Sequence, residues 1–358
     1  MKKTALVQGV SVALAAAVLF GGAGGAQAAG QSTLYLYNWT DYVSPKAIAQ
    51  FEKQYHAKVV QNYFTSNAEM FSKLRSGGDA QYDVIVPTDY FVPRLVQAKL
   101  IQPLGRLKAR QQIAEEFLKA DYDPGGRYSL PYLWGATGII YDTQALPDIP
   151  HSWKALFDEQ ANPRQPFSLL GGDAQVLFGA SCAALGLGFD CVGQDDWVKA
   201  GRAVSETLQR PNFQGFTDST AAIDQVVRGV AKVAVTYSGD FDYRRDASPD
   251  TYRHIGFFIP SEGSQRGVDT LAIPAHAPHP ELARRFIEFM QQPEIAALNA
   301  RYSHYYTPNK GAEEVLAQQG IKATPDQQDR DKLMFVPLLE GKQLQLLQQI
   351  WGEVRSRQ

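Results

Sequence analysis

The sequence predicts an α/β protein of two lobes, each a doubly wound sheet flanked by helices. Three observations lead to this fold class. Strand and helix patterns alternate through the first hundred residues, a second alternating region follows after residue 166, and 358 residues exceed what one ordinary core uses. Two successive strand–helix–strand units favour parallel strands, because a crossover helix returns the chain to the same end of the sheet.

The first region has clear element boundaries. Alternating apolar residues predict a strand over Leu34–Trp39, and Ser44 followed by Pro45 marks a helix start. The next expected elements are a strand over Lys58–Phe64, a helix over Ala68–Arg75 that ends at Gly77-Gly78, and a short buried strand over Tyr82–Pro87.

The second region repeats this alternation without an internal repeat of sequence. Strands are expected over Phe167–Leu170, Lys232–Tyr237, Ile255–Ile259 and Thr270–Pro274, and helices over Ala174–Leu187, Asp196–Leu208, Ala221–Gly229, Pro280–Gln291 and Glu294–Arg301. A segment rich in Pro, Gly and aromatic residues separates the two regions. The boundary between them is therefore predicted near Gly135–Gly138.

Residues 1–28 have the pattern of a secretory signal peptide. Lys2 and Lys3 precede an apolar run over Val10–Phe20, and Ala26-Gln27-Ala28 suits cleavage before Ala29. The run is too short to span a bilayer comfortably, and no Cys stands at the cleavage point to carry a lipid. We expect an exported protein of the periplasm that is not embedded in a membrane.

Composition and charge exclude several classes of partner. The chain is 44% hydrophobic and 20% charged, as is typical of a globular protein. Removing the signal peptide takes away two lysines and moves the formal net charge from −2 to −4. The sequence has no basic patch that would indicate nucleic-acid binding. It also has no basic amphipathic helix that would indicate binding to a membrane surface.

Cys182 and Cys191 are the only cysteines of the chain. Two cysteines nine residues apart in an oxidising compartment most simply form one local disulfide. The alternative, a catalytic thiol, would need a His partner that the sequence does not offer.

Tyr37-Asn38-Trp39-Thr40-Asp41-Tyr42 places aromatic rings and a carboxylate where the first strand ends. In open α/β sheets this position faces the ligand crevice. A carboxylate between aromatic rings suits an organic cation, because the rings cover its apolar part while Asp41 accepts charge-assisted hydrogen bonds. The structural alternative is a strand end with packing aromatics and a helix-capping acid.

Four separated motifs follow one another along the chain. They are the hexapeptide at 37–42, Tyr132-Leu133-Trp134-Gly135-Ala136-Thr137-Gly138-Ile139, Asp269-Thr270-Leu271-Ala272-Ile273-Pro274 and Tyr305-Tyr306-Thr307-Pro308-Asn309-Lys310. With these motifs in this order, the chain resembles the periplasmic spermidine/putrescine-binding proteins of ATP-driven importers. The resemblance implies a type II Venus-flytrap fold that closes on a small amine and then docks on the membrane permease of an ABC transporter. It places lobe 1 at 29–135 plus 271–315 and lobe 2 at 136–270 plus 316–358. We expect a monomer.

The resemblance also implies the residues of the ligand site. The matching positions are Trp39, Thr40, Asp41, Tyr42, Thr88, Tyr237, Asp240, Asp269 and Tyr305. Asp240 and Asp269 stand beside strand ends, where an acid can also simply form a turn. Asp89, next to Thr88, is interpreted as a helix cap and not as a ligand contact.

The departures from the family pattern bear on the ligand. Val176, beside Gln175, stands where diamine binders carry a glutamate, and Gly267, after Arg266, stands where they carry a bulky aromatic. With one counter-charge missing and a thinner aromatic wall, short ligands are favoured and spermidine should bind weakly. An inward-facing Arg266 would favour a ligand carboxylate, so an ω-amino acid such as 4-aminobutyrate is the alternative.

Other classes of function have weaker support. His276 and His279 lie between prolines, which disfavours a metal pair, and no Gly-x-Ser-x-Gly, phosphate-loop or His-Glu-x-x-His motif is present. A purely structural protein would leave the acids at the strand ends unexplained. The sequence therefore predicts a binding protein without enzymatic activity, cofactor or metal.

Overall fold

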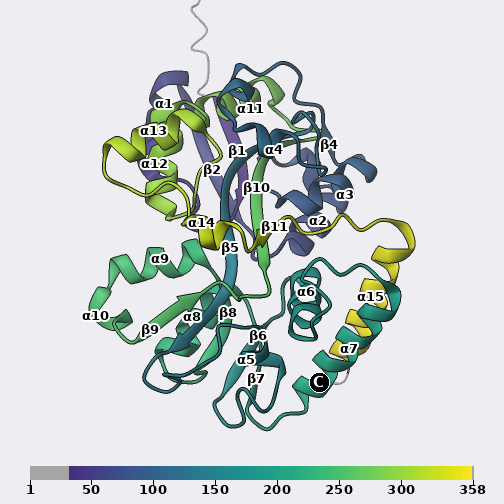
Figure 1. Cartoon of the computed structure of the whole chain (residues 1–358). Helices are drawn as coiled ribbons and strands as arrows, with labels where there is room; N and C mark the ends of the chain where they lie inside the picture. Colours follow the sequence, from purple (N-terminus) through teal and green to yellow (C-terminus); the bar gives the residue numbers. More distant parts are fainter. Residues whose placement is uncertain (1–31, 357–358) are drawn as a thin grey trace, which may run out of the picture. The chain divides into compact units, whose positions relative to one another are not determined.

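In residues 32–356, which the computed structural model describes, eleven strands form one hydrogen-bonded network (Figure 1). The strands are β1 (Ser32–Asn38), β2 (Ala57–Tyr63), β3 (Val84–Ile85), β4 (Ile101–Gln102), β5 (Ser129–Asp142), β6 (Phe167–Leu170), β7 (Phe213–Thr217), β8 (Val233–Tyr237), β9 (Ile255–Phe258), β10 (Ser264–Pro274) and β11 (Leu333–Met334). The predicted signal peptide, residues 1–28, lies outside the described residues.

Fifteen α-helices accompany these strands in the described part of the chain. They are α1 (Pro45–Tyr55), α2 (Asn67–Arg75), α3 (Val92–Gln97), α4 (Glu115–Leu118), α5 (Lys154–Phe157), α6 (Ala174–Ala184), α7 (Gln194–Leu208), α8 (Ser219–Val227), α9 (Ser238–Ala247), α10 (Pro249–Tyr252), α11 (Pro280–Met290), α12 (Pro293–Ser303), α13 (Lys310–Gln318), α14 (Gln327–Arg330) and α15 (Gly341–Arg355). Short 3₁₀ helices occur at Gly78–Ala80, Asp89–Phe91 and Lys108–Gln112.

Two groups of parallel strands are connected through a pair of long antiparallel strands. The main order is β2-β1-β3-β10-β5-β8-β6-β7. β1 runs parallel to β2 and β3, and β6 runs parallel to β7 and β8, while β10 pairs antiparallel with both β3 and β5. The predicted α/β fold with doubly wound sheets is confirmed.

The predicted boundary at Gly135–Gly138 falls inside β5. The first half of this strand pairs with β10, and its second half, from Thr137, pairs with β8 and β9. One continuous strand therefore links the two parallel groups where the sequence suggested a connecting segment. The lobe ranges, 29–135 plus 271–315 and 136–270 plus 316–358, stay a prediction.

Most predicted elements are present, with small differences at their ends. α1 begins at Pro45 as predicted and buries Ile48 and Phe51, and the Phe51 ring packs edge-on against Phe286 of α11 at 5.0 Å. Two elements differ more. β10 begins six residues before the predicted Thr270, and the helix α9 begins at Ser238, directly after β8, where no helix was predicted.

The chain returns across the molecule through a C-terminal strap, residues 331–340, which connects α14 to α15 (Figure 1). Its short strand β11 pairs with the start of β10 at Ser264 and Gln265. α15 then packs against α7 and α6. Within residues 32–356 no helix is long and apolar enough to cross a membrane.

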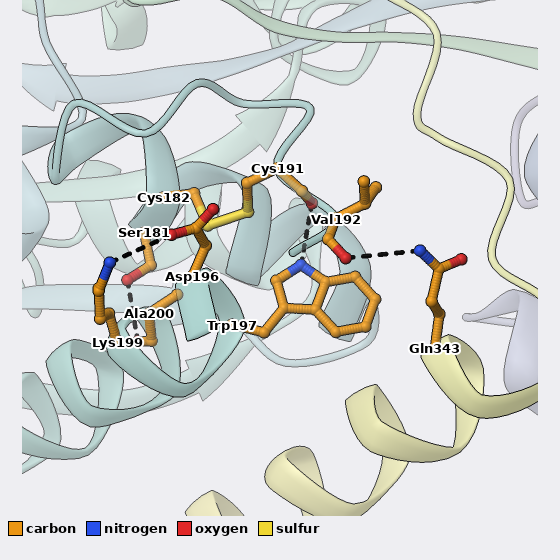
Figure 2. Close-up of a disulfide and its surroundings, with 9 residues drawn as sticks. All are labelled: Ser181, Cys182, Cys191, Val192, Asp196, Trp197, Lys199, Ala200 and Gln343. Carbon is orange, nitrogen blue, oxygen red and sulfur yellow. Dashed lines mark hydrogen bonds and ion pairs between the residues drawn. A yellow bond between two sulfur atoms is a disulfide. The ribbon is translucent and has the colours of Figure 1, made fainter. Parts of the chain in front are cut away.

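Cys182 of α6 and Cys191 in the following loop form a disulfide, as predicted (Figure 2). The carbonyl oxygen of Cys191 accepts a hydrogen bond from Nε1 of Trp197 in α7 at 2.9 Å. The bridge therefore fixes the loop between two helices that pack on one another.

The disulfide should stabilise the fold. The double variant Cys182→Ser/Cys191→Ser should lose about 2–3 kcal/mol of unfolding free energy, because the unfolded chain regains the freedom of a short closed loop. Urea unfolding measures this loss. Intact-mass analysis of the exported protein should show no free thiol, and two alkylatable cysteines under non-reducing conditions would contradict the pairing.

Candidate functional site

A cavity of about 150 Å³ lies where the carboxyl ends of the parallel strands meet. Lining residues stand at or just after the ends of β1, β2, β3, β6, β7 and β8, and the long strands β5 and β10 supply others. A ligand crevice in open α/β sheets has this position. The lining residues are Trp39, Thr40, Tyr42, Phe64, Thr65, Ser66, Asn67, Thr88, Tyr90, Gly135, Thr137, Leu170, Gly172, Asp173, Asp218, Ser219, Thr220, Tyr237, Asp240, Gln265, Gly267, Asp269 and Tyr305.

Asp269 of β10 is held by hydroxyl groups. Its carboxylate accepts hydrogen bonds from Tyr42 at 2.5 Å and from Thr88 at 2.7 Å. The Thr88 hydroxyl is oriented by Asn67, whose amide nitrogen donates to Oγ1 of Thr88 at 2.9 Å. Desolvation raises the pKa of Asp269 to about 6, although the hydroxyl donors oppose the rise.

Asp240, in the first turn of α9, has a similar environment. It accepts hydrogen bonds from Ser219 at 2.5 Å and from Tyr305 at 3.0 Å. Burial raises its pKa, and both hydroxyl donors oppose that shift. A Cβ at Gly239 would lie 2.1 Å from the Tyr305 ring, and one at Gly135 2.8 Å from it, so both glycines make room for this ring.

Two further acids border the cavity from helix N-termini. Asp173 caps α6, because its carboxylate accepts a hydrogen bond from the backbone N–H of Val176 at 3.1 Å. It also accepts a hydrogen bond from the Tyr90 hydroxyl. Desolvation raises the pKa of Asp173, while these donors oppose the rise. Asp218, which is exposed, caps α8 by accepting from the N–H of Ala221 at 2.7 Å. The positive ends of α6, α8 and α9 stabilise negative charge at this cavity.

Sequence reasoning missed Asp173 and Asp218. An acid before a helix is an ordinary N-cap, and the local pattern does not reveal that the same carboxylate borders a cavity. Their positions after strands could have indicated the cavity, because residues that follow parallel strands border the ligand crevice. Asp173 stands three residues after β6, and Asp218 stands directly after β7.

Most residues of the predicted site line the cavity. They are Trp39, Thr40, Tyr42, Thr88, Tyr237, Asp240, Gly267, Asp269 and Tyr305. The Trp39 ring packs edge-on against Phe64 with 4.4 Å between ring centres, and its Nε1 donates to the carbonyl oxygen of Val86 at 3.0 Å. These two rings line the same cavity as Asp269 of β10 and Asp240 of α9.

Four predicted positions lie outside the cavity lining. Asp41 is exposed in a left-handed turn with φ 55°, so the hexapeptide contributes rings but not its carboxylate. Val176 is buried in an apolar core. Gln175 donates to the carbonyl oxygen of Pro337 at 2.6 Å and accepts from Arg94 at 3.0 Å.

Arg266, the fourth, points away from the cavity. Its guanidinium carbon lies 5.4 Å from the ring centres of both Trp134 and Phe335, and Nη1 is 3.6 Å from Glu116. Asp89 is not the simple cap that was predicted either. It is buried, and its carboxylate accepts the N–H groups of Tyr90 and Val268 at 2.6 and 3.3 Å.

The charge of the lining is one-sided. Four Asp carboxylates border the cavity, and among the residues described no Lys, Arg or His lines it. A carboxylate shielded from water favours a positively charged partner, because the ionised group otherwise loses its solvation without compensation. The arrangement thus suits a small cation with an apolar stem that can lie against Trp39, Tyr42 and Tyr305.

Comparison with known proteins agrees with this geometry. Residues 46–328 match the family model described as bacterial extracellular solute-binding protein. The chain belongs to this family.

Named relatives of this solute-binding protein cover most of its length. The spermidine/putrescine-binding periplasmic protein of Salmonella typhimurium is 32% identical over 312 residues, 86% of each chain. The putrescine/cadaverine-binding protein of Pseudomonas aeruginosa is 30% identical over 347 residues, 94% of this chain and 97% of that one. A solved spermidine/putrescine ABC transporter protein of Listeria monocytogenes has a TM-score of 0.80 at 29% identity, covering 92% and 100%.

The raised pKa of Asp269 makes a prediction about the unliganded solute-binding protein. Its folded pKa of about 6 lies above the ordinary 3.8, so its contribution to stability is present below about pH 4 and is lost as pH rises through 6. Between pH 4 and 7 the wild type should lose about 2.4 kcal/mol relative to Asp269→Asn. Urea unfolding of ligand-stripped protein at both pH values measures the difference, and a pH-independent difference would contradict the assignment.

Proposed function

We propose that this solute-binding protein captures a short aliphatic amine of the putrescine type in the cavity and delivers it to the permease of an ABC importer. The observation that carries the proposal is the cavity lining of four aspartates without a cationic side chain in the described chain. Its relatives, which are named as spermidine/putrescine-binding and putrescine/cadaverine-binding proteins, support the same ligand class.

Asp240 and Asp269 are the best partners for two ammonium groups. Each now accepts from two hydroxyl groups, and hydroxyls can turn to accept hydrogen bonds when an ammonium arrives. A charge-assisted hydrogen bond contributes roughly 1.5–3 kcal/mol. Micromolar affinity needs about 8 kcal/mol, so two such acids and contact with the aromatic rings are of the right order.

An ω-amino acid fits less well. Its carboxylate would need a donor with positive charge, and Arg266, the residue that could have supplied it, lies against Trp134 and Phe335 outside the cavity. A buried unpaired carboxylate is costly. The lining therefore favours an amine with positive charge only.

Binding without chemical change is part of the proposal. Relatives over most of the chain are named as binding proteins. Putrescine incubated for a day with excess protein should be recovered unchanged by mass spectrometry, and its conversion to another compound would show an enzyme.

Replacement of Asp269 tests the site directly. Asp269→Asn should weaken putrescine binding about ten- to a hundredfold, because the countercharge is lost while the shape is kept, a loss of roughly 1.5–3 kcal/mol. Isothermal titration measures this. Asp41→Asn is the matched control, since Asp41 is exposed and Asn tolerates its left-handed turn; its affinity should stay within threefold. Unchanged affinity in Asp269→Asn would remove Asp269 from the site.

A ligand panel tests the class. Putrescine and agmatine should raise the melting temperature most, since binding to the folded state alone stabilises it. 4-Aminobutyrate should have little effect and spermidine less than putrescine, because Asp173 already accepts from Tyr90 and Val176 and offers less to a third ammonium. Stabilisation by 4-aminobutyrate or 5-aminovalerate without putrescine would establish the ω-amino acid alternative, and a largest shift from spermidine would refute the preference for short ligands.

A further inference from the structure

Arg94 of α3 lies behind the cavity wall and does not line it. Its guanidinium carbon is 4.6 Å from the centre of the Phe91 ring and 5.8 Å from that of Tyr90. Tyr90 does line the cavity, and its hydroxyl donates to Asp173. Tyr90 therefore contacts both the Arg94 guanidinium and the Asp173 carboxylate.

A second connection joins Arg94 to the same end. Nη2 of Arg94 donates to Oε1 of Gln175 at 3.0 Å, and Gln175 is in the first turn of the helix that Asp173 caps. The Nε2 of Gln175 in turn donates to the carbonyl oxygen of Pro337 in the C-terminal strap. Arg94 is thus fixed in place by aromatic stacking and by a hydrogen bond, although its Nε is buried without a partner.

The three half-buried acids of the cavity differ in their neighbours. Asp240 and Asp269 each accept hydrogen bonds from two hydroxyl groups. The cation that acts on Asp240 from a distance, Arg244, forms its own ion pair with Asp224 at 2.8 Å. Asp173 has Arg94 behind it, and neither residue is in an ion pair with another side chain among the described residues.

We propose that Arg94 determines amine selectivity by partly neutralising Asp173 from outside the cavity. This inference rests on the proposed function. An ammonium that reached Asp173 would meet a carboxylate whose field is already reduced, and it would be repelled by the guanidinium behind it. Arg94 is thus a positioning residue, which acts through Asp173 and restricts strong ammonium binding to Asp240 and Asp269. A longer polyamine therefore gains little binding free energy from its additional ammonium group.

The effect on ionisation agrees with this arrangement. Burial raises the pKa of Asp173, and the Tyr90 hydroxyl, the Val176 N–H and the charge of Arg94 all oppose the rise. Desolvation lowers the pKa of Arg94 itself, while Tyr90 and Asp173 counteract this. The two charges therefore stabilise one another across the Tyr90 ring.

Charge-matched variants test the proposal. Arg94→Met keeps an apolar stem on Phe91 and removes the charge, whereas Arg94→Lys keeps the charge. Isothermal titration with putrescine and spermidine gives the ratio of the two dissociation constants for each protein. In Arg94→Met spermidine should bind about tenfold tighter relative to putrescine than in the wild type, equal to about 1.4 kcal/mol. Arg94→Lys should keep the wild-type ratio within twofold.

A double variant separates charge from structural loosening. In Arg94→Met/Asp173→Asn the gain in relative spermidine affinity should disappear, because the carboxylate at position 173 is no longer present to bind an ammonium. A gain that persists would mean that the strap has loosened and would overturn the proposal. A ratio unchanged in Arg94→Met, with both amines still binding, would also overturn it while leaving the proposed function intact. If neither amine binds the wild type, the proposed function itself fails.

Discussion

The antiparallel pairing of β5 with β10 is the constraint on which the rest of the structure depends. Seven residue pairs connect the two strands, from Arg266 with Ala136 to Ala272 with Ser129. β10 continues the first group of parallel strands through β3, and β5 continues into the second group through β8. The same ladder carries Asp269, Gly135 and Gly267 into the cavity wall. The strands that join the two parallel groups therefore also supply residues of the cavity wall.

The cavity holds aspartate carboxylates that are partly shielded from water, and no cationic side chain among the described residues lines it. Serine, threonine and tyrosine hydroxyls and helix N-termini compensate the carboxylates only in part, which leaves raised pKa values at Asp173, Asp240 and Asp269. An incomplete compensation is useful in a binding protein, because the remaining stabilisation can come from the ligand. If each acid were paired with its own lysine or arginine, the carboxylates would already be compensated, and an incoming cation would gain little from them.

The sequence predicted the fold class and nine of the cavity-lining residues, and the errors share a physical cause. Local sequence located α1 and β6, because Pro45 starts a helix with one apolar face and the four residues of β6 form a short apolar run that is buried throughout. Side-chain direction is set by tertiary contacts. Asp41 was therefore placed in the site although it is exposed in a left-handed turn, and Arg266 was considered for it although its guanidinium lies against Trp134 and Phe335. The early start of β10 also depends on a distant partner, β5, which no local pattern contains.

The hydroxyl donors around Asp240 and Asp269 also bear on the speed of binding. If a lysine had been paired with these acids, an incoming amine would first have to break an ion pair. Here Tyr42, Thr88, Ser219 and Tyr305 need only rotate their O–H bonds, and side-chain torsions of this kind relax in picoseconds to nanoseconds. Asp218, which is exposed and borders the cavity, adds negative potential that attracts a cation during the encounter, and this attraction weakens as ionic strength rises.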